Sequence, residues 1–201
     1  VKFTQKGFNL ALCARSSENL EGLKKELIEL NASNEILIRA TDLSKKKEVL
    51  DFATFIKSKW QRIDVLVNNT GVFSPGEIHK EKEGTLEHMI ETNLYSAYHL
   101  TRALLPTMLL HKGGHIFNMC SVASLYAYPN GGSYSISKFA LLGFSKVLRE
   151  ELKDKGIKVT SLIPGATWTE SWAGSGVSPS RMMKAEDIAS AVWGAYEMGP
   201  S

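Results

Sequence analysis

Tyr134 and Lys138 stand four residues apart in the segment Tyr134-Ser-Ile-Ser-Lys138, and Ser121 precedes the tyrosine by thirteen residues. On a helix, residues i and i+4 share a face, so the lysine ammonium can lie beside the phenol ring. A nearby positive charge favours the phenolate and lowers the pKa of a tyrosine from about 10. A phenol with such a pKa is a general acid or base for a carbonyl or alcohol oxygen.

The tyrosine–lysine spacing is weak evidence when it stands alone. The chain holds six tyrosines, and with its share of lysine about 0.4 such pairs are expected by chance. A solvated helix face is therefore the alternative interpretation. The choice depends on the elements that surround the pair.

Short apolar runs alternate with longer amphipathic segments along the chain. Strands are predicted at 9–14, 35–40, 64–67, 115–120 and 157–163. Helices are predicted at 18–30, from an N-cap at Ser44 to 60, and at 86–110, 133–155 and 185–196. Alternation at this spacing predicts an α/β fold, a doubly wound parallel sheet with helices on both faces. No repeat or linker divides the chain, so one domain over 1–201 is expected.

Polar or turn residues follow each predicted strand. They are Arg15, Asp42, the run Asn68 to Gly71, Ser121, and Pro164 with Gly165. In open α/β sheets, ligands bind beyond the carboxyl ends of the strands. The five strand ends therefore predict a ligand site along one edge of the sheet.

Composition excludes several classes of function. The net charge is +3, with 43% hydrophobic and 22% charged residues, as in an ordinary globular protein. The short run Lys45 to Lys47 is interpreted as a solvated helix start, so nucleic acid is not an expected partner. The five histidines lack metal-ligand spacing, and no metal site is expected.

The location of the protein is predicted from its cysteines and its hydropathy. Cys13 and Cys120 are too few for a disulfide framework, and each lies in an apolar run, which indicates reduced, buried thiols. No apolar stretch reaches the ~20 residues that span a bilayer, and no signal peptide is visible. A cytoplasmic protein without a membrane partner is therefore expected.

The ordered set of motifs resembles the short-chain dehydrogenase/reductase family over nearly the whole chain. The matching residues are Asp42-Leu43, Asn68-Asn-Thr-Gly71, Asn93-Leu94, Ser121, Tyr134-x-x-x-Lys138, Pro164-Gly165 and Thr169. The resemblance implies a Rossmann-like doubly wound fold, a nicotinamide cofactor and hydride transfer at a carbonyl or alcohol carbon. The sepiapterin-reductase and 3-oxoacyl-reductase types are the most similar members.

The resemblance implies a role for each of four catalytic residues. Tyr134 would give a proton to the carbonyl oxygen or take one from an alcohol. Lys138 would lower the pKa of Tyr134 and bind the nicotinamide ribose. Ser121 would hold the substrate oxygen by a hydrogen bond, and Asn93 would help to hold a water that links Lys138 to solvent.

The resemblance also implies a set of cofactor-binding residues. Ala14 stands where an acidic residue would select NAD. Arg15 comes next, and its guanidinium can pair with a 2′-phosphate, which favours NADP(H). The alternative for Arg15 is a solvated surface side chain before a helix. The remaining implied contacts come from four segments: Asp42 and Leu43; Asn69, Thr70 and Gly71; Tyr134 and Lys138; Pro164, Gly165, Thr167 and Thr169. Thr70 stands where the family more often has Ala.

The family's first strand and its glycine-rich phosphate loop have no counterpart in this sequence. Residues 1–6 resemble the end of the helix that follows that loop. That strand would lie between the strands at 9–14 and 64–67. We expect the natural protein to carry about 25–30 further N-terminal residues, enough for a strand, a loop and the first helical turns. The family's last strand is also absent after the helix at 185–196.

The substrate stays open among pterins, acyl thioesters and diketones. The segment 166–184, with Trp168, Trp172, Met182 and Met183, would form a lid, and Tyr126 and Tyr128 would line the same pocket. Aromatic and Met side chains indicate a flat or apolar substrate, with simple packing as the alternative. The helices at 86–110 and 133–155 form dimer faces in the family, which implies a homodimer or homotetramer.

The motifs together predict an NADP-dependent oxidoreductase that reduces a small carbonyl compound to an alcohol, or acts in the reverse direction. The rival hypothesis is a nucleotide-binding regulatory or scaffold protein with a reductase ancestry and no turnover. Intact Asn93, Ser121, Tyr134 and Lys138 argue against that rival. The missing phosphate loop is the one feature that favours it.

Overall fold

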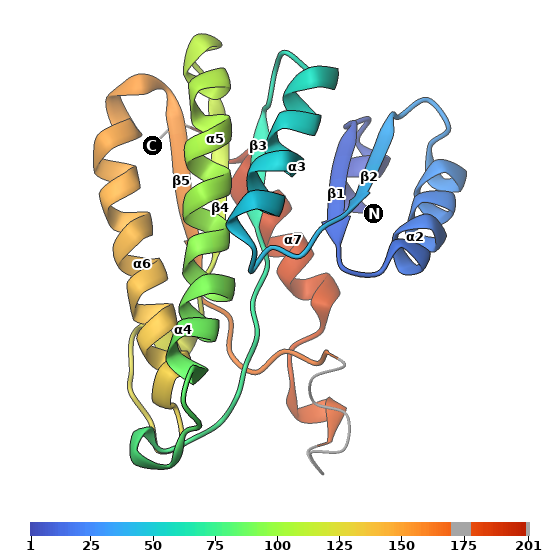
Figure 1. The fold of residues 1–201 in the computed structure, drawn as a ribbon. Coiled ribbons are helices and arrows are strands. Elements are labelled where there is room, and N and C mark those ends of the chain that lie inside the picture. The colour runs from blue at the N-terminus through green and yellow to red at the C-terminus, as the bar shows by residue number, and fades with distance from the viewer. Residues whose placement is uncertain (170–177, 200–201) are drawn as a thin grey trace.

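A computed structural model describes residues 1–169 and 178–199 of the chain (Figure 1). The five strands are β1 (Leu10–Ala14), β2 (Ile36–Ala40), β3 (Val65–Asn68), β4 (Gly114–Met119) and β5 (Ile157–Leu162). Every strand pairing is parallel, and the strands form two groups, β1–β2 and β3–β4–β5. All five predicted strands are confirmed, with ends within one residue of the predicted ones.

The helices follow the strands in the predicted alternation. They are α1 (Lys2–Gln5), α2 (Ser17–Leu30), α3 (Lys46–Lys59), α4 (Thr85–Ile90), α5 (Ser96–Leu110), α6 (Gly132–Leu152) and α7 (Ala185–Glu197). Short turns of tighter helix are η1 (Ile78–Lys80), η3 (Val122–Ser124), η4 (Lys153–Lys155) and η6 (Pro179–Arg181), and η2 (Glu91–Tyr95) is a π-helical turn. Within the described residues, no helix is both long and apolar enough to cross a membrane.

Helices cover both faces of the sheet, as Figure 1 shows with α3 and α5 in front of the strands, α6 beside β5 and α7 behind. The alternation of side chains along β4 explains this arrangement, because neighbouring residues of a strand point to opposite faces. Ile116 belongs to the main core with residues of α3, α5 and α6. His115 and Phe117 stack on each other, and His115 also stacks on Tyr196 of α7. The doubly wound parallel architecture is therefore confirmed.

The start of α3 differs from the prediction. The N-cap residue is Lys45 rather than Ser44, and it makes no side-chain cap hydrogen bond. The Ser44 hydroxyl instead donates to the Asp42 carboxylate at 2.7 Å, and the Ser44 N–H donates to the same oxygen at 3.0 Å. These two contacts hold Ser44 in the turn that precedes the helix, one residue before its N-cap.

The division into two groups of strands leaves β1 and β3 in different sheets. The sequence predicted one further strand between β1 and β3, and that strand stays a prediction. Residues 2–5 form the helix α1, as expected for this segment. Phe3 of α1 packs edge-to-face against Trp193 and Tyr196 of α7, with ring centroids 5.2 and 5.7 Å apart. The helix α1 therefore belongs to the same side of the molecule as α7.

Candidate active site

Tyr134 and Lys138 lie on the first turns of α6, on the same face of the helix. The Lys138 Nζ is 5.8 Å from the centroid of the Tyr134 ring. The lysine side chain is only 5% exposed, and its Nζ donates a hydrogen bond to the carbonyl oxygen of Met119 at 2.9 Å. The predicted meeting of ammonium and phenol is confirmed as geometry, at the carboxyl end of β4.

The pKa values of the pair differ from the expectation. Burial lowers the pKa of Lys138 from 10.5 to about 8. Burial also raises the pKa of Tyr134, and a hydrogen-bonding interaction with the Ser121 hydroxyl opposes that rise. The predicted lowering of the tyrosine pKa by Lys138 is therefore wrong for the protein by itself. The loss of water around the phenol outweighs any effect of the ammonium, which is directed at a backbone carbonyl.

Ser121 is held in place by a turn directly after β4. Its hydroxyl accepts a hydrogen bond from the Ala123 N–H at 3.2 Å, and the Ser124 hydroxyl accepts one from the Ser121 N–H at 3.1 Å. The Val122 N–H donates to the carbonyl oxygen of Pro164 at 3.1 Å, which joins the ends of β4 and β5. The turn presents the Ser121 hydroxyl to the Tyr134 phenol.

Asn93 lies in the π-helical turn η2, which interrupts the helix predicted over 86–110. Its side chain is 1% exposed and makes three hydrogen bonds to oxygen or nitrogen. The amide oxygen accepts from the Val72 N–H at 2.7 Å, and the amide nitrogen donates to the Val72 carbonyl at 3.0 Å and to the Ser137 hydroxyl at 2.9 Å. Asn93 thus fastens the loop after β3 to the helix α6. π-Helical turns of this kind are common at functional sites.

Ser137 was not recognised from the sequence as part of the site. Its hydroxyl accepts from Asn93 and donates to the Tyr134 carbonyl at 2.7 Å, and the residue is fully buried. The one feature of the sequence that could have pointed to Ser137 is its position directly before Lys138. A serine there is one of three between Gly131 and Lys138, so its type alone could not single it out.

Gly71 allows the loop after β3 to approach both Lys138 and Asn93. A Cβ atom on Gly71 would lie 3.3 Å from the Lys138 Nζ and 3.4 Å from the Asn93 Oδ1. The sequence predicted that this glycine serves a close approach to the cofactor. The structure shows a close approach to two side chains of the site, and the approach to the cofactor stays a prediction. Asn69 is exposed and Thr70 half-buried beside it.

Arg15 and Asp42 lie near each other at the carboxyl ends of β1 and β2. The Ser44 hydroxyl is the main cause of the lowered pKa of Asp42, and the charge of Arg15 contributes to it. Arg15 is exposed, and its guanidinium makes no hydrogen bond or ion pair with any residue that the structure describes. Leu43 is half-buried and packs against the main core.

The segment after β5 folds back on the residues that precede α7. The Thr167 hydroxyl donates to the Gly165 carbonyl at 3.2 Å, and the Trp168 N–H donates to the Met183 carbonyl at 2.9 Å. Thr169 is exposed at the end of the described segment. Trp172, predicted to belong to a lid, falls outside the described residues.

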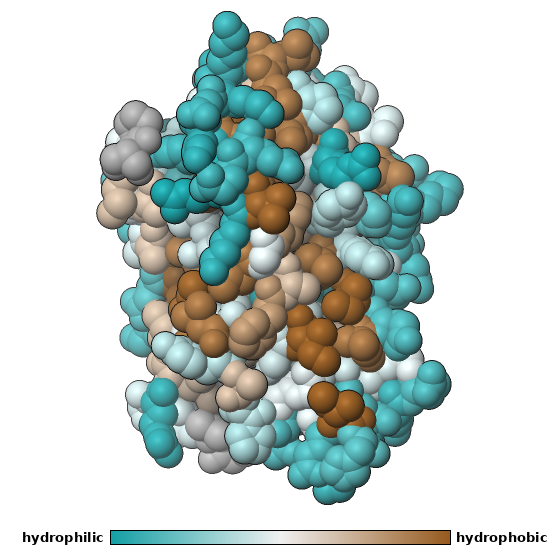
Figure 2. Space-filling model, turned by 90° about the vertical axis from the view of Figure 1, so that its left-hand side faces the viewer, coloured by the Kyte–Doolittle hydropathy of each residue, from teal (hydrophilic) through white to brown (hydrophobic). Residues whose placement is uncertain are grey.

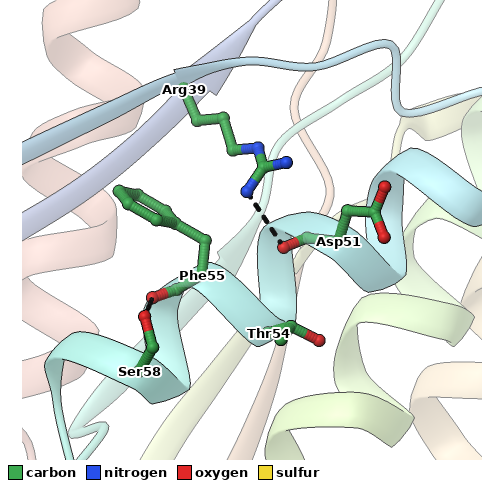
Figure 3. A pocket seen from close by; sticks show the side chains of 5 residues that line it. All are labelled: Arg39, Asp51, Thr54, Phe55 and Ser58. Atoms are coloured by element: carbon green, nitrogen blue, oxygen red, sulfur yellow. Dashed lines mark hydrogen bonds between the residues drawn. The ribbon is translucent and has the colours of Figure 1, made fainter.

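Two surface depressions lie away from Tyr134, Lys138 and Ser121. The first, of about 430 Å³, lies along α3 and is drawn in Figure 3. Its Arg39 guanidinium lies 5.6 Å from the Phe55 ring and donates to the Asp51 carbonyl at 3.3 Å. The second, of about 790 Å³, lies between the start of α3 and the helices η2 and α5. The side-chain polar groups of the first depression already have partners on α3, most of them backbone carbonyls. None of the residues that line it belongs to the site.

A buried polar network braces the sheet beneath the site. The Asn68 Nδ2 donates to the Thr101 hydroxyl at 3.0 Å and to the Asn118 Oδ1 at 2.8 Å. The Asn118 Nδ2 in turn donates to the Ser145 hydroxyl at 2.8 Å. The network joins β3, β4, α5 and α6, the elements that carry or support the site. Across the two described stretches, no group of three metal-ligating side chains is present.

Comparison with known proteins gives consistent matches. The family model described as short chain dehydrogenase matches residues 1–177. A sepiapterin reductase from Chlorobaculum tepidum is 31% identical over 188 residues, which are 93% of this chain and 76% of the relative. A 3-oxoacyl-(acyl-carrier-protein) reductase from Thermotoga maritima is 32% identical over 164 residues, 81% of this chain and 65% of the relative. Both types of relative that the motifs suggested are therefore among the matches.

The relatives are longer than this chain, which spans 62% of the length of one further relative and 80% of another. A solved structure of a metagenomic short-chain oxidoreductase in complex with NADP is similar over the whole fold. It superposes with a TM-score of 0.82 at 30% identity, with 99% of this chain and 83% of that chain covered.

Proposed function

Because the chain belongs to the short-chain dehydrogenase family, we propose that it reduces a carbonyl group of a small molecule to an alcohol with NADPH. The observation that carries this proposal is the meeting of three groups at one edge of the sheet: the Tyr134 phenol, the Ser121 hydroxyl and the buried Lys138 ammonium. The bound nicotinamide would supply the hydride, and the chain's residues would supply positioning and the proton.

Tyr134 is the proposed proton donor. Its raised pKa keeps the phenol protonated at neutral pH, which is the form that a reduction needs. The Ser121 hydroxyl would donate a hydrogen bond to the same carbonyl oxygen and hold it in line with the phenol. Negative charge that develops on this oxygen would then draw the proton from Tyr134.

Lys138 is the proposed partner that resupplies the proton. With a pKa of about 8, its ammonium exchanges a proton with solvent more readily near neutral pH than an ordinary lysine does. Asn93 would act by holding the loop at Val72 and the helix α6 in fixed relative positions. These roles use the geometry of the side chains and require no metal ion.

NADP(H) is the proposed cofactor. Arg15 is exposed at the end of β1 with its guanidinium donors unused by the described residues, so it fits a 2′-phosphate. The solved relative in complex with NADP supports the same choice. Asp42, Leu43, Asn69, Thr70 and Gly71 would contact the adenosine side. Pro164, Gly165, Thr167 and Thr169 would contact the nicotinamide, and Tyr134 and Lys138 its ribose.

A flat or apolar carbonyl compound is the proposed substrate class. The Phe73 ring lies edge-on to the Tyr134 ring, with centroids 4.8 Å apart, and it is 42% exposed. Tyr128 is 41% exposed and lies near enough to Tyr134 to interact with it electrostatically. Exposed aromatic rings beside the reacting hydroxyl favour an apolar ligand over a strongly charged one.

A homodimer or homotetramer is the proposed assembly, with α5 and α6 at the contact between copies. Figure 2 shows brown, hydrophobic side chains among polar ones on the side of the molecule where α6 lies. Ile136, Phe139 and Val147 of α6 are 42%, 45% and 58% exposed, and Leu110 of α5 is 81% exposed. Apolar side chains exposed on one face are typical of a contact surface. Light scattering of the protein as it elutes from a size-exclusion column would give its molar mass and so the number of chains in the assembly.

A cytoplasmic location is also proposed. Cys13 and Cys120 are free thiols, and burial raises the pKa of Cys13 to about 11. Burial raises the pKa of Cys120 as well. Two protonated, shielded thiols suit a reducing compartment.

Incubation of the full-length protein with NADPH and a panel of diketones, acyl thioesters and pterins tests the proposed reaction. Tyr134→Phe should lower turnover by at least about 100-fold, the usual contribution of a general acid, and leave NADPH binding within a few-fold. Tyr95→Phe, which removes an exposed hydroxyl elsewhere, serves as the matched control. Full turnover by Tyr134→Phe would refute the role of the phenol, and a wild-type protein inactive on every substrate would favour a non-catalytic protein.

The cofactor is tested through Arg15. Arg15→Asp should reverse the preference from NADPH to NADH, because the new carboxylate repels a 2′-phosphate and accepts hydrogen bonds from a ribose. The ratio of kcat/KM for the two cofactors measures the preference. An unchanged ratio would remove Arg15 from the cofactor site.

A further inference from the structure

A carboxylate from a distant loop lies on the N-terminal end of α6. Glu81 follows η1, in the segment between β3 and α4. One of its carboxylate oxygens accepts a hydrogen bond from the Ser133 N–H at 2.8 Å, and the other accepts a short hydrogen bond from the Ser133 hydroxyl. Ser133 is 2% exposed and directly precedes Tyr134 in the chain.

The backbone around this contact is built for close approach. Gly132, the first residue of α6, has a φ of +34°, in the region that favours glycine. A Cβ atom there would meet the Glu81 carboxylate and would lie 2.5 Å from the Gly76 carbonyl oxygen. The Gly76 N–H donates to the Asn130 carbonyl at 3.0 Å, so the loop is also fastened to the turn before α6.

Glu81 supplies a cap that the helix cannot supply itself. The first N–H groups of an α-helix have no partner within the helix, and a side chain at the N-cap position usually accepts from one of them. The N-cap of α6 is Gly131, which has no side chain, and the carboxylate of Glu81, 52 residues before Ser133, takes its place. A negative charge at this end also interacts favourably with the helix dipole. Among the described residues, no cation pairs with Glu81, so the helix end is its counterpart.

We infer that Glu81 is a positioning residue for Tyr134: through Ser133 it fixes the first turn of α6 and so holds the phenol against the Ser121 hydroxyl. Tyr134 is the third residue of this turn, so any rotation or fraying of the turn moves its side chain directly. The inference deepens the proposed function and rests on it. The position of the phenol is nevertheless a property of the protein that is measurable without turnover.

The first experiment compares Glu81→Ala and Glu81→Gln with the wild type in the reductase assay. Glu81→Ala should lower kcat about tenfold, the effect of losing one cap on the geometry of the reacting phenol, with KM for NADPH changed less than twofold. Glu81→Gln keeps an oxygen that accepts from the Ser133 N–H, and it should recover most of kcat. Glu81→Gln also removes a negative charge near Tyr134. The pKa that limits kcat on the alkaline side of the pH profile should therefore be lower than in the wild type by about 0.2–0.7 unit.

Glu83→Ala is the matched control, because Glu83 is an exposed carboxylate two residues further along the same loop with no hydrogen bond or ion pair to the described residues. It should keep wild-type kcat and the wild-type pH profile. A Glu81→Ala variant with the kcat of this control would overturn the inference. If Glu81→Ala does not fold, Ser133→Ala, which removes one of the two hydrogen bonds, should show a smaller loss of kcat in the same direction.

The second experiment measures the phenol itself. In protein labelled with 13C at the tyrosine ring carbon that bears oxygen, the Tyr134 signal is identified by its absence in Tyr134→Phe. Glu81→Ala should shift or broaden this signal, and Glu83→Ala should leave it in place. An unmoved Tyr134 signal in Glu81→Ala would refute the positioning role even in an active enzyme. A moved signal in a protein without turnover would support the positioning role and count against the proposed function alone.

Discussion

The replacement of Lys138 by methionine tests the central electrostatic feature of the site. Lys138→Met keeps the length and most of the volume of the side chain and removes its charge. The ammonium is 5% exposed, and burial lowers its pKa from 10.5 to about 8. The folded protein therefore resists the charged form, and the variant should be inactive in reduction but more stable at neutral pH.

The magnitude follows from proton linkage. One unit of pKa shift corresponds to about 1.4 kcal/mol, so the charge destabilises the folded state by about 3 kcal/mol at pH 7. The variant loses the hydrogen bond to the Met119 carbonyl, worth about 1 kcal/mol. The net gain in the free energy of unfolding is about 2 kcal/mol at pH 7.

The stability advantage of Lys138→Met should shrink as the pH rises. The folded pKa lies below the unfolded one, so between pH 8 and 10.5 the unfolded chain binds more protons and wild-type stability rises with pH. By pH 10 the charge costs only about 1 kcal/mol, and the advantage of Lys138→Met should fall to about zero. Titration of other groups occurs in both proteins and cancels in the difference.

Urea unfolding of both proteins at pH 7 and pH 10 measures these differences. Lys146→Met is the control, because Lys146 is an exposed lysine on the same helix, and its stability should stay within about 0.5 kcal/mol of the wild type. A Lys138→Met variant that is less stable than the wild type at pH 7, or a difference that does not change with pH, would refute the reasoning.

Two further predictions concern stability. Burial, and secondarily the charge of Lys158, lowers the pKa of His115 from 6.5 to about 4, so wild-type stability should fall as pH drops from 6.5 toward 4. Between pH 7 and pH 5, the free energy of unfolding in urea should fall by about 2 kcal/mol less for His115→Leu than for the wild type. An equal fall in both proteins would contradict the lowered pKa of His115. Asn118→Ala should destabilise by about 2–3 kcal/mol, because it removes two buried hydrogen bonds and leaves a cavity. A double-mutant cycle with Asn68→Ala should give a coupling of about 1 kcal/mol, and strict additivity would disprove the proposed brace.

The sequence predicted the elements that its periodicity describes strongly. The apolar run at 10–14 and the spacing of Leu20 and Leu27 in α2 depend on neighbours in the chain. The sequence did not predict the π-helical turn at Asn93. The residues that bind Asn93 there, Val72 and Ser137, are 21 and 44 residues away in the chain. The N-cap of α3 was wrong for a related reason: Ser44 has a better hydrogen-bond partner in Asp42.

The sequence by itself determined the alternation of strands and helices, the sharing of one helix face by Tyr134 and Lys138, and the set of polar residues at the strand ends. These three features depend on residue type and on residues a few positions apart, whose relative positions the regular geometry of a helix or strand fixes. Tertiary structure alone decided the pKa of the phenol, because desolvation depends on everything that surrounds the ring. It also decided that Glu81 caps the helix of Tyr134, because only the folded chain brings residues 52 positions apart within hydrogen-bond distance.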